Sequence, residues 1–219
     1  MAYVVLVLIV LGGAGAHAQS ADNPQSATRA GRRVNLPVVK EVALARSAAP
    51  AAISADAGVM MLTDSGYVVA EQGKSSVTCV VNRSWSHAVE PHCYDEEGAR
   101  TVMLIELRRN FLRHRGVSES EIEADIGRGL LAGKFRLPTR PALSYMMSSA
   151  QILYDDKGKL VGKWRPHLMI YFPYMTTQSL GFREQPEMTV GMVSESGEPS
   201  SSLIVLMPRF AESASARSP

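Results

Sequence analysis

One helical section, flanked on both sides by short apolar runs, sets the fold class of this 219-residue chain. The stretch 98–115 has an apolar stripe at helical spacing, formed by Leu104, Leu107 and Phe111. A second helix is expected to begin at Ser118, which matches a capping box with Glu121. Its stripe consists of Ile122, Ile126 and Leu130. The connection at Gly116 is short, which predicts that the two helices are antiparallel neighbours.

Four arginines crowd the end of the first predicted helix, namely Arg108, Arg109, Arg113 and Arg115. One interpretation is a phosphate-binding patch. The other is that they compensate the helix dipole and face the acids of the second helix, which include Glu119, Glu123 and Asp125. Placement at a helix end already explains the charges, so the second interpretation is favoured.

The remaining apolar runs indicate strands. The runs 58–62 and 67–70 flank a turn that ends at Gly66, and with a third strand over 76–85 they predict a meander. A helix is expected over 38–48, before Pro50. Further strands are expected over 143–147, 150–154, 164–172 and 203–207, the last two continuous enough to be buried on both faces. A long surface loop is predicted over 176–202. The predicted fold class is α+β, a mainly antiparallel or mixed sheet packed with the antiparallel helical hairpin.

The two ends read as segments outside the fold. Residues 1–18 combine a short apolar run with an A-x-A pattern at Ala16–Ala18, which is typical of a signal peptide. An uncleaved N-terminal anchor is the alternative. A flexible leader is expected over 19–36, a single domain over 37–210 and a disordered tail over 211–219. The pattern predicts export to the periplasm or the extracellular space.

Composition excludes several classes of function. A net charge of +2 is not the basic balance of a dedicated nucleic-acid binder. After signal removal no stretch reaches the roughly 18 apolar residues of a transmembrane span. Phosphate-cradling and dinucleotide-binding glycine motifs are absent from the sequence, so we expect no cofactor.

Cys79 and Cys93 are the two cysteines of the chain. In an oxidising compartment two thiols without a third predict one disulfide. The alternative is a metal site that uses His87 and His92, because imidazole and thiolate are both zinc ligands. Their spacing is not a standard one, so these histidines are weak candidates.

His167, at the start of an apolar run, is the strongest single candidate for catalysis. A hydrolase-like arrangement could combine it with Ser148 or Ser149 and with Asp155. No G-x-S-x-G nucleophile motif occurs in the sequence, and a histidine at a strand rim more often makes an ordinary hydrogen bond. These residues are therefore weak catalytic candidates.

A region rich in methionine and tyrosine predicts a shallow apolar pocket. Both side chains are adaptable contacts for ligands or partners. The candidate ligand-binding residues are Tyr145, Met147, Met169, Tyr171 and Tyr174. The alternative is ordinary core packing, which must apply to about half of the alternating positions in a strand.

Four segments carry a resemblance to a known group of proteins: Gly66–Ala70, Thr78–Trp85, Ser144–Ser148 and Pro166–Tyr174. With these segments the chain resembles a group of uncharacterised exported bacterial proteins over residues 44–180. The resemblance implies a bacterial cell-envelope setting and assigns no activity, cofactor or site.

The sequence thus favours a non-catalytic exported domain that binds a small apolar or amphipathic ligand or an envelope protein. The hydrolase-like enzyme that uses His167 is the alternative. No nucleic acid is expected as a partner.

Overall fold

The computed structural model describes residues 36–83, 88–154, 159–182 and 191–211. The predicted signal peptide over 1–18, the leader over 19–36 except Leu36, and the predicted tail beyond Ala211 lie outside the described residues. Within these ranges, no helix is long and apolar enough to cross a bilayer.

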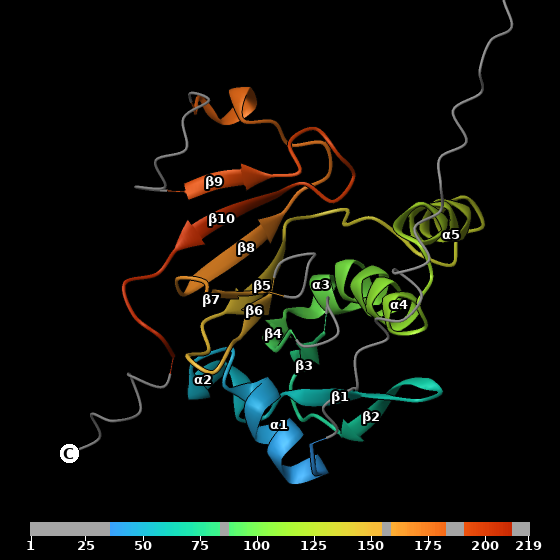
Figure 1. Ribbon diagram of the computed structural model, residues 1–219. Helices are drawn as coiled ribbons and strands as arrows, with labels where there is room; N and C mark the ends of the chain where they lie inside the picture. The colour runs from blue at the N-terminus through green and yellow to red at the C-terminus, as the bar shows by residue number, and fades with distance from the viewer. Residues whose placement is uncertain (1–35, 84–87, 155–158, 183–190, 212–219) are drawn as a thin grey trace, which may run out of the picture.

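A sheet of eight strands forms the centre of the fold (Figure 1). Its order is β2-β1-β3-β4-β5-β8-β10-β9. Every neighbouring pair is antiparallel except β1 and β3, which pair in parallel. The strands are β1 (Gly58–Thr63), β2 (Gly66–Glu71), β3 (Thr78–Asn82), β4 (Glu90–Tyr94), β5 (Ala142–Met146), β8 (His167–Tyr171), β9 (Gly191–Ser194) and β10 (Ser202–Leu206). The α+β class and the mainly antiparallel, mixed sheet are as predicted.

The predicted meander of the first three strands is wrong. β1 and β2 form the expected hairpin, but β3 pairs with β1 and β4 and leaves β2 at the edge of the sheet. Burial explains the difference. Val68 and Val69 on β2 are exposed, as suits an edge strand, whereas Val80 and Val81 on β3 are fully buried in the interior of the sheet.

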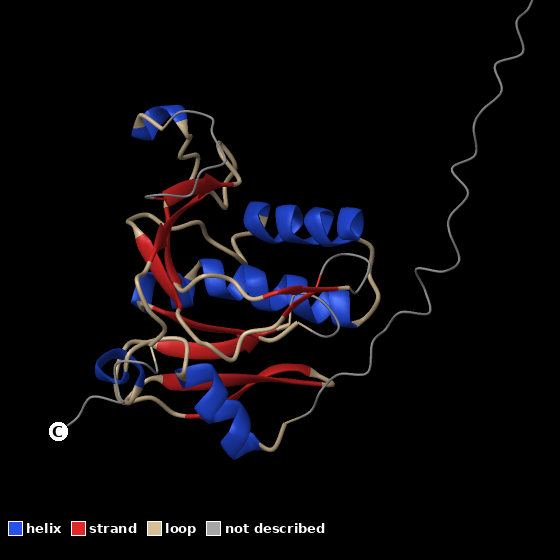
Figure 2. Cartoon of the chain, turned by 60° about the vertical axis from the view of Figure 1, so that its left-hand side comes forward, coloured by secondary structure: helices blue, strands red, loops and turns tan. Residues whose placement is uncertain are grey.

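Helices cover both faces of the sheet around β3 and β4. α1 (Val38–Arg46) packs on one face, and α4 (Val102–His114) lies on the other (Figures 1 and 2). Side chains of a strand alternate between the faces, so Cys79, Val81 and Cys93 join the α1 cluster while Val80 and Tyr94 join the α4 cluster. The other short elements are α2 (Ala51–Ser54), α3 (Glu96–Arg100), a 3₁₀ turn (Gln178–Leu180), and the hairpin of β6 (Leu153–Tyr154) and β7 (Leu160–Gly162).

The helical section is divided differently from the prediction. The prediction of a single helix from residue 98 is wrong, because the helical conformation is interrupted at Thr101 (φ −127°, ψ −89°) between α3 and α4. Of the predicted stripe, Leu107 is buried whereas Leu104 is 38% exposed. The predicted capping box at the start of α5 (Glu119–Leu131) is confirmed, and Gly116 has a positive φ of 73° after α4.

Three of the four arginines pair with acids of α5. Arg108 Nε lies 2.8 Å from Asp125 Oδ2, Arg109 Nε lies 2.9 Å from Glu123 Oε1, and Arg113 Nε lies 2.8 Å from Glu119 Oε1. Each guanidinium also donates a second hydrogen bond to the same carboxylate. The favoured interpretation of these arginines as partners of the α5 acids is confirmed.

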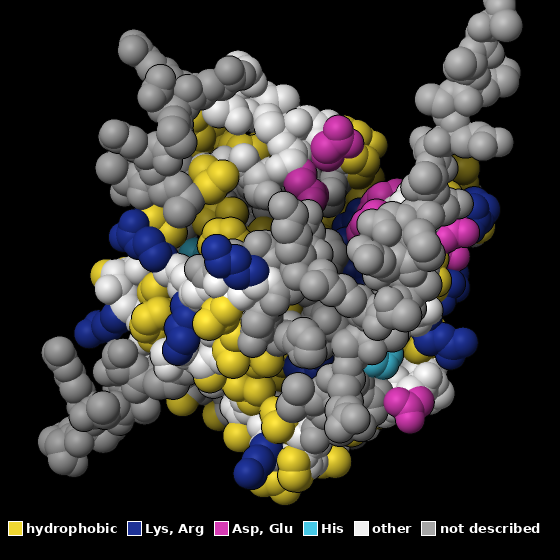
Figure 3. All heavy atoms as spheres, viewed as in Figure 1, with side chains coloured by type: hydrophobic (Ala, Val, Ile, Leu, Met, Phe, Trp, Pro, Cys, Tyr) yellow, Lys and Arg dark blue, Asp and Glu magenta, His cyan; other side chains and the backbone are white. Residues whose placement is uncertain are grey.

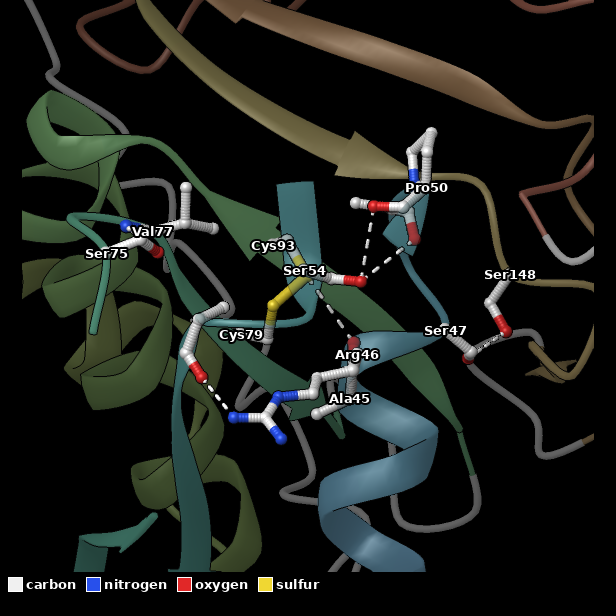
Figure 4. Close-up of a disulfide and its surroundings, with 12 residues drawn as sticks. Ala45, Arg46, Ser47, Pro50, Ser54, Ser75, Val77, Cys79, Cys93 and Ser148 are labelled. Atoms are coloured by element: carbon white, nitrogen blue, oxygen red, sulfur yellow. Dashed lines mark hydrogen bonds between the residues drawn. A yellow bond between two sulfur atoms is a disulfide. The ribbon is translucent and has the colours of Figure 1, made fainter. Parts of the chain in front are cut away.

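Cys79 and Cys93 lie directly opposite each other on β3 and β4, at disulfide distance, with 2.00 Å between their sulfur atoms. The predicted cysteine pair is confirmed. Figure 4 shows the bond near the end of α1 that carries Ala45, whose carbonyl oxygen lies 3.6 Å from the Cys93 sulfur. Both cysteines are fully buried, so the pair is part of the core on the α1 face.

The C-terminal part of the sheet is less covered than predicted. The middle residues of β8 and most of β10 are only half-buried, so burial on both faces is wrong for these strands. Hydrophobic side chains reach the surface between dispersed Lys and Arg side chains on the face shown in Figure 3. The predicted loop over 176–202 contains strand β9, which pairs with β10. Its four residues lie among Pro, Gly and Ser, where local pattern is weak.

Candidate functional site

A pocket of about 360 Å³ lies between α4 and the sheet face that α4 covers. Because alternate residues of a strand share a face, the sheet side of the pocket is built from every second residue of six strands. β4 supplies His92 and Tyr94, β8 supplies His167, Met169 and Tyr171, and β10 supplies Ile204 and Leu206. β3, β5 and β9 add Asn82, Met146 and Met192. α4 closes the pocket with Val102, Glu106 and Asn110.

The end of the pocket beneath α4 is polar and buried. The Tyr94 hydroxyl accepts a hydrogen bond from Asn82 Nδ2 at 3.2 Å and lies 3.1 Å from His92 Nδ1. The His92 and Tyr94 rings are stacked, with centroids 5.5 Å apart. Burial, with a smaller contribution from the charge of His167, lowers the pKa of His92 to about 3. His92 is therefore neutral, and its Nδ1 shares a hydrogen bond with the Tyr94 hydroxyl.

Several polar atoms at this end have no hydrogen-bond partner among the described residues. They are Asn82 Oδ1, Asn110 Oδ1, Asn110 Nδ2 and the Tyr67 hydroxyl. Asn110 lies close enough to Tyr67 to oppose the effect of burial on the tyrosine pKa, but the two groups lack the geometry of a normal hydrogen bond. Leaving a buried polar group unpaired costs about 1–3 kcal/mol, so these atoms lower the stability of this part of the fold.

The opposite part of the pocket is apolar and partly open. Met146, Met169, Ile204 and Leu206 form its wall. Trp164 and Met192 also line it, and each is exposed over 40% or more of its surface, so they mark the mouth. An apolar wall that leads from an open mouth to a few buried polar groups is typical of small-molecule sites.

The charges around the pocket are mostly acidic. Glu106 and Glu195 line it together with Arg165. The Glu106 carboxylate accepts a hydrogen bond from Arg109 Nη1 at 2.7 Å, which neutralises it locally. A wider groove of about 590 Å³, between the α4 and α5 residues and the segment 195–200, adjoins the pocket at Val102, Glu106 and Tyr171.

His167 is buried in the same pocket as His92 but has a different hydrogen-bond partner. Its Nδ1 lies 2.7 Å from the Arg165 carbonyl oxygen, which can only accept, so Nδ1 carries the proton. The Trp164 ring meets it edge-on, with centroids 6.1 Å apart. Burial lowers the pKa of His167, against the opposite effect of the Arg165 carbonyl.

The structure does not bring the proposed hydrolase residues together. Ser148 Oγ lies 2.6 Å from Ser47 Oγ at the end of α1, and neither Ser148 nor Ser149 is hydrogen-bonded to His167 (Figure 4 shows the serine pair). Asp155 lies outside the described residues. Within the described ranges the hydrogen bond of the His167 ring is the one to Arg165, so no nucleophile–base pair is formed there.

The predicted alternative of a metal site has no support among the described residues. No three His, Cys, Asp or Glu side chains there are placed to bind a metal ion. His87 lies outside the described residues, and Cys93 is bonded to Cys79.

Two of the five predicted ligand-binding residues line the pocket, namely Met169 and Tyr171. Tyr145 points to the opposite face and packs against the α1 cluster. Met147 is buried, and its amide donates to the Ala48 carbonyl. Tyr174 is 60% exposed in the loop after β8. These three do not join the site.

Asn82, Tyr94 and Asn110 were not predicted as site residues. Asn110 had a signal in the sequence, because it continues the stripe of Met103 and Leu107 at a position where an apolar residue is expected. Asn82 and Tyr94 had none, since only the pairing of β3 with β4 places them beside each other.

Neither profiles of protein families, nor curated proteins, nor solved structures give a match to this chain.

Proposed function

We propose that this chain is an exported domain that binds a small amphipathic ligand and does not catalyse a reaction on it. The observation that carries the proposal is the pocket itself. Its mouth at Trp164 and its wall of Met169 and Ile204 suit an apolar tail, and its buried end beside His92 suits a polar head.

The affinity would come mainly from the apolar wall. Each methylene that moves from water into such a wall contributes about 0.8 kcal/mol. Methionine side chains adapt to the shape of a tail, and Met146, Met169 and Met192 surround the pocket on three strands. The polar end would set the orientation of the ligand and its specificity.

On this proposal, α4 and α5 form an antiparallel helical hairpin, and α4 provides one wall of the pocket. The order of the ion pairs along the two helices supports the antiparallel arrangement. Arg108, Arg109 and Arg113 on α4 pair with Asp125, Glu123 and Glu119, so the numbers rise on one helix as they fall on the other. A hairpin tied at three points would hold Asn110 rigidly over the sheet.

The catalytic alternative has less support. A general base needs a nucleophile or a water-binding partner within hydrogen-bond distance, and the described neighbour of His167 is the Arg165 carbonyl. The burial of both histidines also favours their neutral, hydrogen-bonding forms.

Export is supported by the apolar run and the A-x-A pattern of residues 1–18 and by the Cys79–Cys93 pair, because disulfides persist in oxidising compartments. Expression of the full chain in a bacterium, followed by cell fractionation and mass spectrometry, tests it. We expect a periplasmic or secreted product that begins at Gln19. A product that keeps Met1 and stays in the cytoplasm would contradict export.

Ligand binding is tested with Nile red, a neutral amphipathic dye whose fluorescence rises in apolar sites. We expect saturable binding to the native protein. Ile204→Trp fills the pocket from β10 and should weaken binding at least about tenfold, which corresponds to about 1.4 kcal/mol.

The matched control is Leu203→Trp. Leu203 neighbours Ile204 on the same strand and is half-buried like it, but its side chain lies on the opposite face of the sheet. The control should bind the dye like the native protein. Equal binding by both variants would place the dye elsewhere and refute the proposed site.

A further inference from the structure

The start of β8 and the end of β10 lie side by side and form a basic end of the sheet. The amide of Met207, just after β10, donates to the carbonyl of Pro166, just before β8, at 2.8 Å. The segments that meet here, 159–165 and 207–209, are mostly exposed and contain no acid. Their cations are Lys159, Lys163, Arg165 and Arg209. These two segments are called the basic end below.

Neighbouring residues do not cancel the charge of the basic end. Lys163, Arg165 and Arg209 form no ion pair with any described residue, and Lys163 Nζ donates to the neutral Ser149 carbonyl at 2.6 Å. The turn 155–158 lies outside the described residues and adds two acids and one cation. With it, the region has five cations against two acids, so it is basic in either count.

The opposite end of the same strands is acidic. β10 begins at Ser202, which pairs with Ser194 of β9, and Glu195 and Glu198 follow β9 there. The Glu198 carbonyl accepts from the amide of Tyr174, after β8, at 2.9 Å. Figure 3 shows Lys and Arg side chains on its left, where β10 ends in Figure 1, whereas the visible Asp and Glu side chains lie at its top and right. This polarity favours one orientation of the molecule on a negatively charged surface.

Two large hydrophobic side chains are exposed at the basic end, Leu160 at 58% and Trp164 at 46%. The position of Trp164 is fixed, because its carbonyl accepts from Gln151 Nε2 at 3.1 Å and its ring meets the His167 ring edge-on. Tryptophan prefers the boundary between lipid headgroups and acyl chains, because its ring is apolar and its N–H is a donor. Cations beside such a ring are typical of a contact with an anionic membrane surface.

We propose that the basic end docks on the surface of an anionic phospholipid bilayer. Its cations lie against the lipid phosphates, and Trp164 and Leu160 enter the headgroup region. An acidic soluble macromolecule would use the cations but would gain little from these two hydrophobic side chains. The mouth of the pocket, which Trp164 and Arg165 line, then opens toward the bilayer. The inference goes beyond the proposed function, because docking does not require an occupied pocket.

The experiment is co-sedimentation of the native, disulfide-bonded protein with vesicles of phosphatidylcholine, either alone or mixed with phosphatidylglycerol. We expect binding to the mixed vesicles that weakens as salt is added, and at least about tenfold weaker binding to phosphatidylcholine alone. Equal binding to both kinds of vesicle, or binding to neither, would overturn the inference. No dye is present, so this result and the Nile red result can fail separately.

A pair of double variants locates the contact. Arg165→Gln/Arg209→Gln should weaken binding to the mixed vesicles about ten- to thirtyfold. Arg128→Gln/Arg136→Gln removes the same charge from exposed positions on and after α5, and this control should bind like the native protein. Native-like binding by the first variant would assign the contact elsewhere, for example to the arginines of residues 19–36, and would refute the docking surface.

A third variant separates a lipid surface from a purely ionic contact. Trp164→Ala keeps every charge of the basic end and removes its largest hydrophobic side chain. We expect it to bind the mixed vesicles at least about fivefold more weakly than the native protein. Unchanged binding would mean that charge alone makes the contact, as with a soluble polyanion, and would overturn the assignment to a bilayer.

Discussion

At the scale of single residues, burial lowers the pKa of both histidines of the pocket, and each ring makes a different hydrogen bond. His92 shares a hydrogen bond with the Tyr94 hydroxyl at Nδ1, whereas His167 donates from Nδ1 to the Arg165 carbonyl. A proton added to either ring would place a charge in a buried site and would repel the other ring.

The acid sensitivity of the fold follows from these histidines. The native state keeps His92 neutral down to about pH 3, whereas the unfolded chain takes up a proton below about pH 6.5. The unfolded state binds more protons in this window, so the free energy of unfolding falls as the pH falls. We expect a slope of up to about 1.4 kcal/mol per pH unit from His92 between about pH 6.5 and 5, above the range of the carboxylates.

Urea unfolding at several pH values measures this slope. His92→Gln should reduce it, and the slope that remains in this range should come from His167, whose pKa is also lowered by burial. Tyr94→Phe removes the hydroxyl but keeps the histidine, so it should leave the slope in place. An unchanged slope in His92→Gln would show that His92 is not the group responsible.

Asp95 is a second residue whose role can be measured. Its Oδ1 accepts from the amide of Gly98 at 2.7 Å, which caps α3, and from the amide of Leu143 at 3.1 Å, beside β5. Asp95→Ala leaves both amides without this acceptor, and we expect a loss of about 1–2 kcal/mol in the free energy of unfolding. Asp95→Asn keeps a capping oxygen and should lose less than half of that. Equal losses in the two variants would contradict the capping role.

At the scale of elements, the contact between α4 and α5 depends on partly exposed ion pairs. The Arg108–Asp125 pair has two hydrogen bonds, at 2.8 and 3.1 Å, and both side chains are about 30% exposed. Such pairs contribute about 0.2–1 kcal/mol. A double-mutant cycle with Arg108→Ala and Asp125→Ala should give a coupling energy in that range, and the coupling should decrease in high salt. A coupling of zero at low salt would show that packing alone joins the helices.

The elements that the sequence predicts well are those with a strong local signal. The capping box of Ser118 and Glu121 locates the start of α5, and the turn at Gly66 locates the β1–β2 hairpin. Strand order has no such signal. β3 joins β1 rather than β2, and its valines are buried in clusters on both faces of the sheet, which depend on residues far away in the chain.

The candidate site was predictable only in part for the same reason. Met169 and Tyr171 are predicted from the methionine and tyrosine content of this region, and they share a face because they lie two residues apart on one strand. Tyr145 lies on the opposite face because its neighbour Ser144 is the residue that meets Tyr171. Which face of β5 meets the pocket depends on its register with β8, and a single strand does not encode it.

At the scale of the whole molecule, the sheet has two differently built parts. Around β3 and β4, helices cover both faces and the strands are buried. Around β8 and β10, the strands are half-buried, and the pocket lies where the two parts meet. The pocket therefore has helix-covered strands on one side and a half-buried part of the sheet on the other.

The Cys79–Cys93 bond should contribute strongly to the stability of the helix-covered part of the sheet around β3 and β4, and so to the stability of the whole fold. It closes a loop over a sequence separation of 14 in the best-buried part of the sheet. Removing such a cross-link raises the entropy of the unfolded chain and costs about 3 kcal/mol.

We expect the urea midpoint of the protein to fall clearly when a reductant is added. The double variant Cys79→Ala/Cys93→Ala should have a low midpoint that the reductant does not change. A native protein with the same midpoint in both conditions, and free thiols confirmed by mass spectrometry, would show that the packing of α1 on β3 and β4 holds this region without the bond.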